Sequence, residues 1–256
     1  MRIRWLRSIG LLVLAAGCGS PGSELSSGSD PEANGSALFS APTNRSDLVR
    51  HPDSEGSPGT GPTLDPSPIH VLFLGTSLTE GLGLDRPGSD AWPSRIADLA
   101  DSVGIPIAVT NAGLGGDTSA GALRRLDWVL RQGPDVLIVE TGANDGLRGL
   151  PVDQLEDNLD EIVRWVHSEF PDVEVLLSQM EAPPSMGADY TEAFREVYPR
   201  VAERREVKLI PFLLEGVAAN PALNQRDGIH PTPEGHRRMA QNAWPTIEES
   251  IRAAVR

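Results

Sequence analysis

The sequence predicts an α/β fold, and three observations support this expectation. From about Pro68 onward, short runs of apolar residues alternate with longer amphipathic segments. Strands that are apolar along their whole length are typical of parallel sheets that helices cover on both faces. Residues 67–256 make a segment of about 190 residues, which suits one domain of this class. We therefore expect a single domain in which helices pack on both faces of a five-stranded parallel sheet.

The elements follow from periodicity and length. The predicted strands are the apolar runs at residues 69–74, 105–110, 135–140, 173–178 and 207–210. The predicted helices cover residues 91–102, 119–132, 152–170, 190–205 and 233–252. In 119–132, for example, apolar residues recur at helical spacing: Leu123, Leu126, Val129 and Leu130. Each strand is thus followed by a helix, as a parallel sheet requires.

The N-terminus has the layout of a secretory signal. Basic residues precede an apolar run at residues 9–16, which is too short to span a bilayer. Small residues then precede Cys18, as in a bacterial lipoprotein lipobox, so we expect residues 1–17 to be cleaved and Cys18 to be lipidated. Lipidation also explains why an exported chain has only one cysteine. The alternative is an ordinary signal peptide that happens to contain a cysteine.

Residues 18–66 are rich in Ser, Gly and Pro and poor in aromatic residues. Such a composition buries too little apolar surface to offset the entropy of ordering, so we expect a flexible tether between the lipid and the domain. A glycosylated, mucin-like stalk is the alternative. Together these features predict an exported protein, lipid-anchored to a bacterial membrane on its periplasmic or cell-surface face.

The charge of the chain restricts its partners. The formal net charge is −14, and cleavage after Gly17 would remove three arginines and leave −17. Such a surface does not suit nucleic acid, so we expect no nucleic-acid partner. The acidic surface and the lack of an obvious apolar patch favour a monomer.

Four clusters of small and polar residues lie at the predicted carboxyl ends of strands or before the last helix. They are Gly75-Thr76-Ser77, "NAGLGGDTS" at 111–119, "ETGANDG" at 140–146 and "RDGIHPTPEGH" at 226–236. Open α/β sheets bind their ligands beyond the carboxyl ends of the strands. The clusters therefore predict one site at that edge.

The clusters contain the parts of a serine nucleophile system. Ser77 needs a base, which is usually a histidine held by a carboxylate. His230 lies three residues after Asp227, so that Asp227 could reach Nδ1 while Nε2 faces Ser77. The N–H groups of Ser77 and Gly116 and the side-chain amide of Asn144 could stabilise an oxyanion. Taken singly, each cluster could be only a polar turn or a helix cap.

The order Gly-Thr-Ser-Leu, Gly-Gly-Asp-Thr, Gly-Ala-Asn-Asp and Asp-Gly-Ile-His resembles the four blocks of the SGNH (GDSL) hydrolase family. The resemblance covers residues 69–245, and "ETGANDGLRG" and "DGIHPTPEGH" are similar to its bacterial arylesterase and thioesterase/lysophospholipase branch. It implies a flavodoxin-like, three-layer α/β/α sandwich. It also implies a Ser77–His230–Asp227 triad and an oxyanion hole from Ser77, Gly116 and Asn144, with no metal and no cofactor.

Thr76 stands where the family usually has Asp. We expect this change to affect the rigidity of the turn modestly and to leave the chemistry intact. The Gly-x-Ser-x-Gly motif of ordinary α/β-hydrolases is absent.

The expected substrates are small acyl esters or thioesters, including aryl esters and lysophospholipids with short to medium acyl chains. Leu147 and Leu150, on a predicted loop at 145–151, and Pro183 and Met186, after the fourth strand, are candidates for an acyl pocket. They could equally be loop residues packed on the scaffold. One alternative function is a carbohydrate O-acetyl esterase, which twelve aromatic residues in the whole chain disfavour. Another is a non-catalytic binding lipoprotein that keeps only the fold.

Overall fold

The computed structural model describes residues 67–254. The predicted signal peptide over residues 1–17, the lipidation site Cys18 and the tether over residues 18–66 lie outside the described residues. Among the described residues, no helix combines the length and the apolar character needed to cross a membrane.

Five parallel strands form the sheet, which confirms the predicted fold class. They are β1 (Ile69–Gly75), β2 (Ile107–Gly113), β3 (Val136–Val139), β4 (Glu174–Ser178) and β5 (Lys208–Ile210). Their spatial order is β2-β1-β3-β4-β5, and every neighbouring pair is parallel. This is the flavodoxin-like order, in which the order of strand addition reverses between β1 and β3 while all strands stay parallel. The carboxyl ends of these two strands are therefore where a site is expected.

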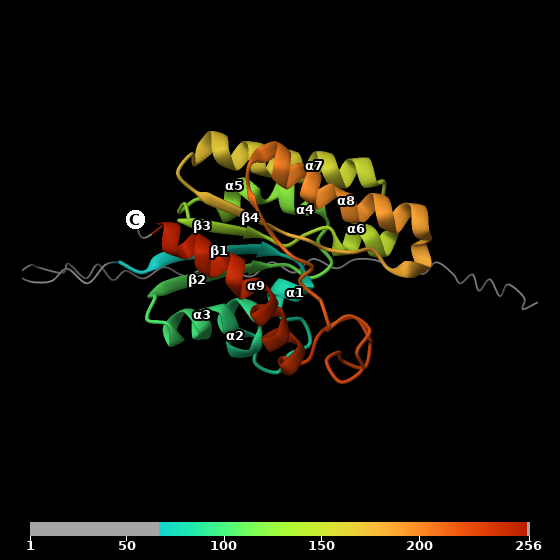
Figure 1. The fold of residues 1–256 in the computed structure, drawn as a ribbon, viewed down its shortest axis with the longest axis horizontal. Helices are drawn as coiled ribbons and strands as arrows, with labels where there is room; N and C mark the ends of the chain where they lie inside the picture. The colour runs from blue at the N-terminus through green and yellow to red at the C-terminus, as the bar shows by residue number, and fades with distance from the viewer. Residues whose placement is uncertain (1–66, 255–256) are drawn as a thin grey trace, which may run out of the picture. The chain divides into compact units, whose positions relative to one another are not determined.

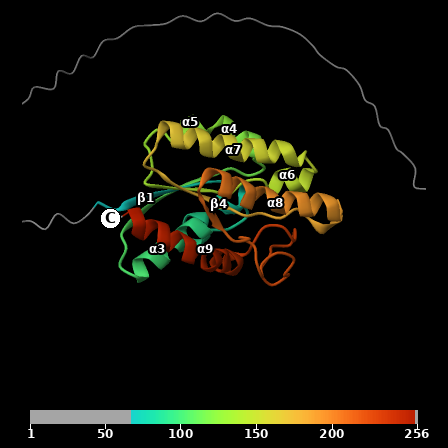
Figure 2. The same ribbon diagram turned by 45° about the horizontal axis from the view of Figure 1, so that its top comes forward.

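Helices cover both faces of the sheet, so the molecule has the three layers that the sequence predicts (Figure 1). One layer contains α2 (Pro87–Asp90), α3 (Trp92–Ser102) and α9 (Pro233–Ala254). The other contains α4 (Ser119–Arg124), α5 (Leu126–Val129), α7 (Val152–Glu169) and α8 (Ala188–Arg205). The turned view separates the two layers, with α3 beside α9 and α7 beside α8 (Figure 2).

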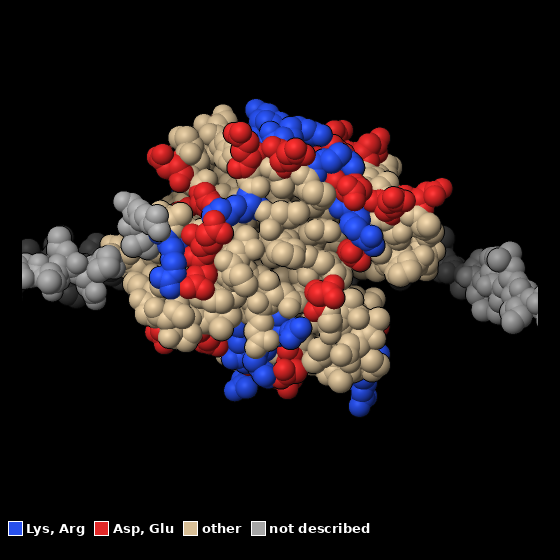
Figure 3. Space-filling model, viewed as in Figure 1, with Lys and Arg blue, Asp and Glu red and all other residues tan. Residues whose placement is uncertain are grey.

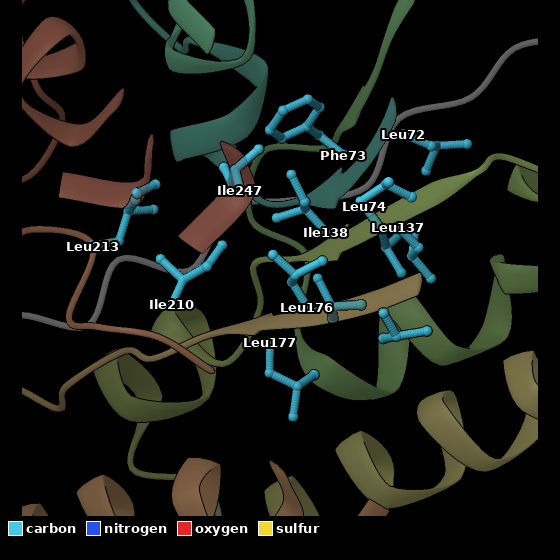
Figure 4. Close-up of a cluster of buried hydrophobic side chains, with 14 of the residues drawn as sticks. Leu72, Phe73, Leu74, Leu137, Ile138, Leu176, Leu177, Ile210, Leu213 and Ile247 are labelled. Carbon is cyan, nitrogen blue, oxygen red and sulfur yellow. The ribbon is translucent and has the colours of Figure 1, made fainter. Parts of the chain in front are cut away.

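The core lies on both sides of the central strands. Phe73, Ile138 and Leu176 are register partners on β1, β3 and β4, so their side chains point to the same face. Phe73 packs edge-on against the buried Trp92 of α3, with ring centroids 4.8 Å apart. The intervening residues, such as Leu137 and Leu177, fill the opposite side (Figure 4). Because both faces are buried, the strand ends have little freedom to move.

The second strand differs from its prediction. The sequence predicts a buried strand at 105–110, but β2 begins at Ile107 and continues to Gly113, and none of its residues is buried. The physical reason is its place at the edge of the sheet, where it pairs with β1 alone. Asn111, Ala112 and Gly113, expected in the following loop, are therefore the last residues of the strand.

The single helix predicted at 119–132 is also wrong. The chain forms α4 and α5 with a break at Arg125, whose backbone leaves the helical region. The Arg125 guanidinium donates to the carbonyl oxygens of Gly75 and Ala112 and to the Asp117 carboxylate, at 2.8–2.9 Å. The interruption thus occurs at the residue whose side chain turns toward the sheet edge. The predicted loop at 145–151 is likewise partly helical, because α6 spans Ala143–Arg148.

Candidate active site

The nucleophile candidate lies where β1 ends. Ser77 is the first residue of the short helix α1 (Ser77–Glu80), which Thr76 caps. The turn is tight, because a Cβ atom on Gly75 would lie 2.0 Å from Thr79 Oγ1. Only glycine fits there, so the chain can pass directly from the strand into the helix. The Ser77 N–H is the first of its helix, a position without an intrahelical acceptor.

The structure brings Ser77, His230 and Asp227 together in one row. His230 Nε2 lies 3.0 Å from Ser77 Oγ, and His230 Nδ1 lies 2.6 Å from Asp227 Oδ2. The histidine and the aspartate belong to the segment between β5 and α9. An antiparallel bridge between Asn224 and Pro231 closes this loop, and Gln225 N–H donates to His230 O at 2.7 Å. Residues 153 positions apart in the chain thus come within hydrogen-bond distance.

The Asp227 carboxylate is ionised and oriented by its own loop. Besides His230 Nδ1, it accepts the backbone N–H groups of Ile229 and His230, both at Oδ1, at 2.9 and 3.0 Å. The hydrogen bond from the His230 side chain and those from the two backbone groups lower the pKa of Asp227 to about 2. Because Nδ1 faces this carboxylate, the tautomer with its proton on Nδ1 leaves Nε2 free to accept the serine proton.

Gly116 and Asn144 lie on two segments that contact each other. Asn144 Nδ2 donates to Asp117 O at 2.8 Å, and Arg148 donates to Gly116 O at 2.8 Å. Leu114 N–H joins the same loop to the strand end at Gly75 O. Gly116 has a φ of 76°, which favours glycine, and its N–H has no acceptor among residues 67–254. The Gly116 N–H and the second amide hydrogen of Asn144 thus remain available at this edge.

A buried pair that sequence analysis missed holds α6 to the start of α4. Ser119 donates from its N–H and its Oγ to the carboxylate of Asp145, at 2.9 and 2.5 Å. Asn158 of α7 donates to the same Ser119 Oγ at 2.9 Å. Asp145 is the residue after Asn144, and Ser119 closes the loop that contains Gly116. The pair therefore joins the two segments that carry the candidate oxyanion donors.

A second buried carboxylate lies beneath the nucleophile turn. Glu140, just after β3, accepts hydrogen bonds from Thr76 and Thr79. Burial raises its pKa to about 7, against the lowering effect of these hydrogen bonds. Sequence analysis placed Glu140 only at the end of a strand. The available signal was a carboxylate that directly follows the apolar run Val136–Val139 at the point where the strand order reverses.

The four acyl-pocket candidates lie on neighbouring segments. A Cβ atom on Gly149 would lie 2.6 Å from Met186 Cε, so the two loops are in contact. Leu147 is 45% exposed, whereas Leu150, Pro183 and Met186 are partly buried. Three clefts of about 330, 720 and 540 Å³ have none of these four residues and no Ser77 in their walls. The acyl pocket stays a prediction. Within residues 67–254, no group of three or more His, Cys, Asp or Glu residues could hold a metal ion.

Comparison with known proteins agrees with this geometry. Residues 73–238 match the model of the GDSL-like lipase/acylhydrolase family. Esterase TesA of Pseudomonas aeruginosa is 38% identical over 179 residues, covering 70% of this chain and 87% of that protein. Thioesterase 1/protease 1/lysophospholipase L1 of Escherichia coli K12 is 40% identical over 162 residues, covering 63% of this chain and 74% of that protein.

The crystal structure of TesA superposes with a TM-score of 0.67 at 38% identity, covering 71% of this chain and 99% of that one. The family match over residues 73–238 includes all four clusters that the sequence singled out. The chain belongs to the GDSL-like lipase/acylhydrolase (SGNH) family and is a carboxylic ester hydrolase.

Proposed function

We propose that the chain hydrolyses acyl esters through Ser77, His230 and Asp227 acting as a catalytic triad. The observation that carries this proposal is the continuous row from Ser77 Oγ through both ring nitrogens of His230 to Asp227 Oδ2, with steps of 3.0 and 2.6 Å. These are the contacts that general-base activation of a serine requires.

In this mechanism His230 Nε2 takes the proton of Ser77 Oγ as the oxygen attacks the acyl carbonyl carbon. Asp227 stabilises the imidazolium. Negative charge develops on the carbonyl oxygen, where the N–H groups of Ser77 and Gly116 and the Asn144 amide donate, and each donor contributes about 3 kcal/mol. The imidazolium then protonates the leaving alcohol or thiol, and water repeats the sequence on the acyl-enzyme.

For the substrate we propose small acyl esters and thioesters: aryl esters, lysophospholipids and other short to medium acyl chains. The names of the two relatives, an esterase and a thioesterase/lysophospholipase, support this class. Exposed leucine and isoleucine side chains near the row also suit an acyl chain. Leu82 follows α1, Leu147 lies on α6, and Ile229 is the neighbour of His230, and each is 42–48% exposed.

We further propose that the protein is exported and held at a bacterial membrane by a lipid on Cys18, as a monomer. The order of the basic stretch, the apolar run and the cysteine supports this location. Membrane fractions of cells that express the full chain should contain the protein. A Cys18→Ala variant should move to the soluble fraction, and a variant that stays with the membrane would contradict lipidation.

Labelling with a fluorophosphonate probe tests the triad directly. The probe should react with the wild-type chain, and peptide mapping should place the label on Ser77. Ser77→Ala should lose both labelling and turnover of an aryl ester. Ser102→Ala is a matched control, because Ser102 is an exposed serine that donates only to the neighbouring Leu99 carbonyl on α3. Undiminished turnover in Ser77→Ala would refute the mechanism.

A further inference from the structure

The carboxyl group of Glu140 is enclosed at the centre of the sheet edge. Its residue is 0% exposed, and it lies between the ends of β1 and β3. It accepts three donors: the Thr76 N–H at 2.9 Å, the Thr76 hydroxyl at 2.9 Å and the Thr79 hydroxyl at 2.8 Å. All three come from one turn of chain, so the carboxyl group binds a single segment.

As a purely structural feature, this arrangement would lower the stability of the folded state. A carboxyl group without a neighbouring cation loses solvation on burial, and desolvation is the largest influence on the pKa of Glu140. None of its hydrogen-bond partners is basic. An apolar side chain of similar volume would fill the same space without that cost. Stability of the fold alone therefore does not account for Glu140.

The three donors flank Ser77. Thr76 precedes it and Thr79 follows it by two positions, so the carboxyl group constrains the turn on both sides of the serine. The Thr76 hydroxyl also accepts from Leu78 N–H at 3.4 Å, which makes it the N-cap of α1. Thr79 in turn accepts from the indole N–H of the buried Trp92 at 3.2 Å. The turn is thereby joined to α3 as well as to β3.

Thr76 suits this role through its hydroxyl. A hydroxyl group donates one hydrogen bond and accepts two, so Thr76 can donate to Glu140 and cap the helix at once. An ionised carboxylate at the same position could cap the helix but could not donate to Glu140. The residue that departs from the usual Gly-Asp-Ser pattern of the family therefore fits the buried carboxyl group of this chain.

We propose that Glu140 is a positioning residue for the nucleophile, and that it acts through Thr76 and Thr79 to set the direction of the Ser77 N–H and Oγ. This inference rests on the proposed function, in which Ser77 is the nucleophile. Small displacements at a reacting centre are costly, since about 1 Å of misplacement can reduce a rate by roughly 10²-fold. The contacts of Glu140 should therefore influence kcat more than KM, because none of them faces the expected substrate.

Two substitutions of Thr76 separate positioning from folding. Thr76→Val keeps the shape of the side chain and removes the hydroxyl, whereas Thr76→Ser keeps the hydroxyl and removes the methyl group. Glu140→Gln is the third variant, since an amide offers only one acceptor atom to the three donors. The control is Thr141→Val, because the Thr141 hydroxyl is buried next to Glu140 but has no hydrogen-bond partner within residues 67–254.

The measurements are kcat and KM with an aryl ester, the rate of fluorophosphonate labelling, and the thermal midpoint of each variant. We expect kcat to fall at least about tenfold in Thr76→Val and roughly 10²-fold in Glu140→Gln, with KM nearly unchanged. Thr76→Ser and Thr141→Val should keep kcat within about threefold of the wild type. The labelling rate should follow kcat, because both depend on the attack by Ser77.

The Thr76 pair decides the outcome even if Glu140→Gln does not fold. Equal kcat in folded Thr76→Val and Thr76→Ser, whether both normal or both reduced, would overturn the positioning role. A reduced kcat in Thr141→Val of the same size as in Thr76→Val would also overturn it. Absence of label on Ser77 in the wild type would be a failure of the proposed mechanism, which this design detects separately.

Discussion

The two halves of the proposed triad are held in opposite ways. The nucleophile turn, Gly75–Thr79, is buried, follows a central strand and is bound from below by Glu140. The base loop, Asp227–His230, has no core contacts of that kind, and the Asp227 side chain is 46% exposed. The loop maintains its shape through its own hydrogen bonds, from the backbone to Asp227 and from Gln225 to His230 O.

This difference shows that the two parts of the proposed site are held in place differently. Contacts with distant, buried segments hold the nucleophile turn, whereas hydrogen bonds within its own segment hold the base loop. Because the sheet positions the turn, substitutions in the turn should lower both the stability and the activity of the protein. The loop needs only a short hydrogen-bonded segment, so substitutions there should affect activity with little effect on stability. The following predictions test that division, from the largest expected effect to the smallest.

The largest effect is expected at His230. Replacing it with alanine removes the proposed base for Ser77 and should lower kcat about 10⁶-fold, since triad members act as a unit. The thermal midpoint should change little, because residues 227–229 are exposed and the ring is not part of the hydrophobic core. Turnover assays and calorimetry on the same samples measure both quantities. A large loss of stability in His230→Ala would break the distinction between the two halves.

Asp227→Asn should have the next largest effect on activity. The amide leaves the loop in place but removes the negative charge that stabilises the imidazolium, and we expect kcat to fall about 10⁴-fold. Because the pKa of Asp227 is about 2, the wild-type carboxylate stays ionised until the pH falls to that value. If activity is already lost on acidification while the pH is still above about 4, protonation of Asp227 is therefore not the cause. A pH–rate profile of wild type and variant measures this, and loss of activity in parallel with protonation of Asp227 near pH 4 would contradict it.

Glu140 should make the stability of the nucleophile turn depend on pH. Its pKa rises from the ordinary 4.5 to about 7 in the folded state, so the folded state holds the proton more tightly than the unfolded chain. Stability from this group is therefore fully present below pH 4.5 and is lost as the pH rises to about 7. The loss is on the order of 3 kcal/mol, at about 1.4 kcal/mol per pKa unit.

The comparison variant for this effect is Glu140→Gln, which cannot titrate. Denaturant unfolding of both proteins at several pH values gives the difference in free energy of unfolding, wild type minus variant. That difference should decrease between pH 4.5 and 7 and stay constant above about pH 8. A difference that increases with pH would show that folding favours the ionised carboxylate.

The smallest effect is expected on the outer surface of one helix layer, where α7 and α8 carry a network of ion pairs. Glu156 accepts from Arg200 and Arg204, and Asp160 accepts from Arg204 and Arg205. Acidic and basic side chains alternate over this surface (Figure 3). The pKa of Glu156 is lowered, mainly by its hydrogen bonds with Arg200.

Since the arginines of this network remain partly exposed to solvent, Glu156→Gln should lower the free energy of unfolding by about 1 kcal/mol or less. The effect should shrink in high salt, and kcat should stay unchanged. Denaturant titrations at low and high ionic strength measure it. A change in kcat would mean that this network of ion pairs also influences the site.

Much of the site could be predicted from the sequence because its chemistry is local. Asp227 and His230 are three residues apart, so their pairing depends on a single turn and needs no knowledge of the fold. Ser77 directly follows an apolar run that can be recognised as a strand. The parallel sheet then brings the two together, and its strand order agrees with the resemblance.

What the sequence did not reveal depends on contacts between distant segments. Glu140 binds Thr76 across 64 positions, and periodicity contains no information about such a pair. The break at Arg125 is hidden for the same reason, because Leu123, Leu126, Val129 and Leu130 keep helical spacing while the arginine turns toward Gly75 O. The exposure of β2 depends on strand order, which local patterns do not specify.

The closeness of Asp227 and His230 along the chain has a consequence for how this enzyme could be altered. The Asp227 carboxylate and the His230 imidazole lie on one surface segment. A shift of that segment would therefore move both groups away from Ser77 without separating them from each other. A homologous segment of different sequence, inserted between Asn224 and Pro231, would exchange the whole proton-accepting unit in one step and leave the strand framework untouched. New pH behaviour could thus be engineered here with the scaffold held constant.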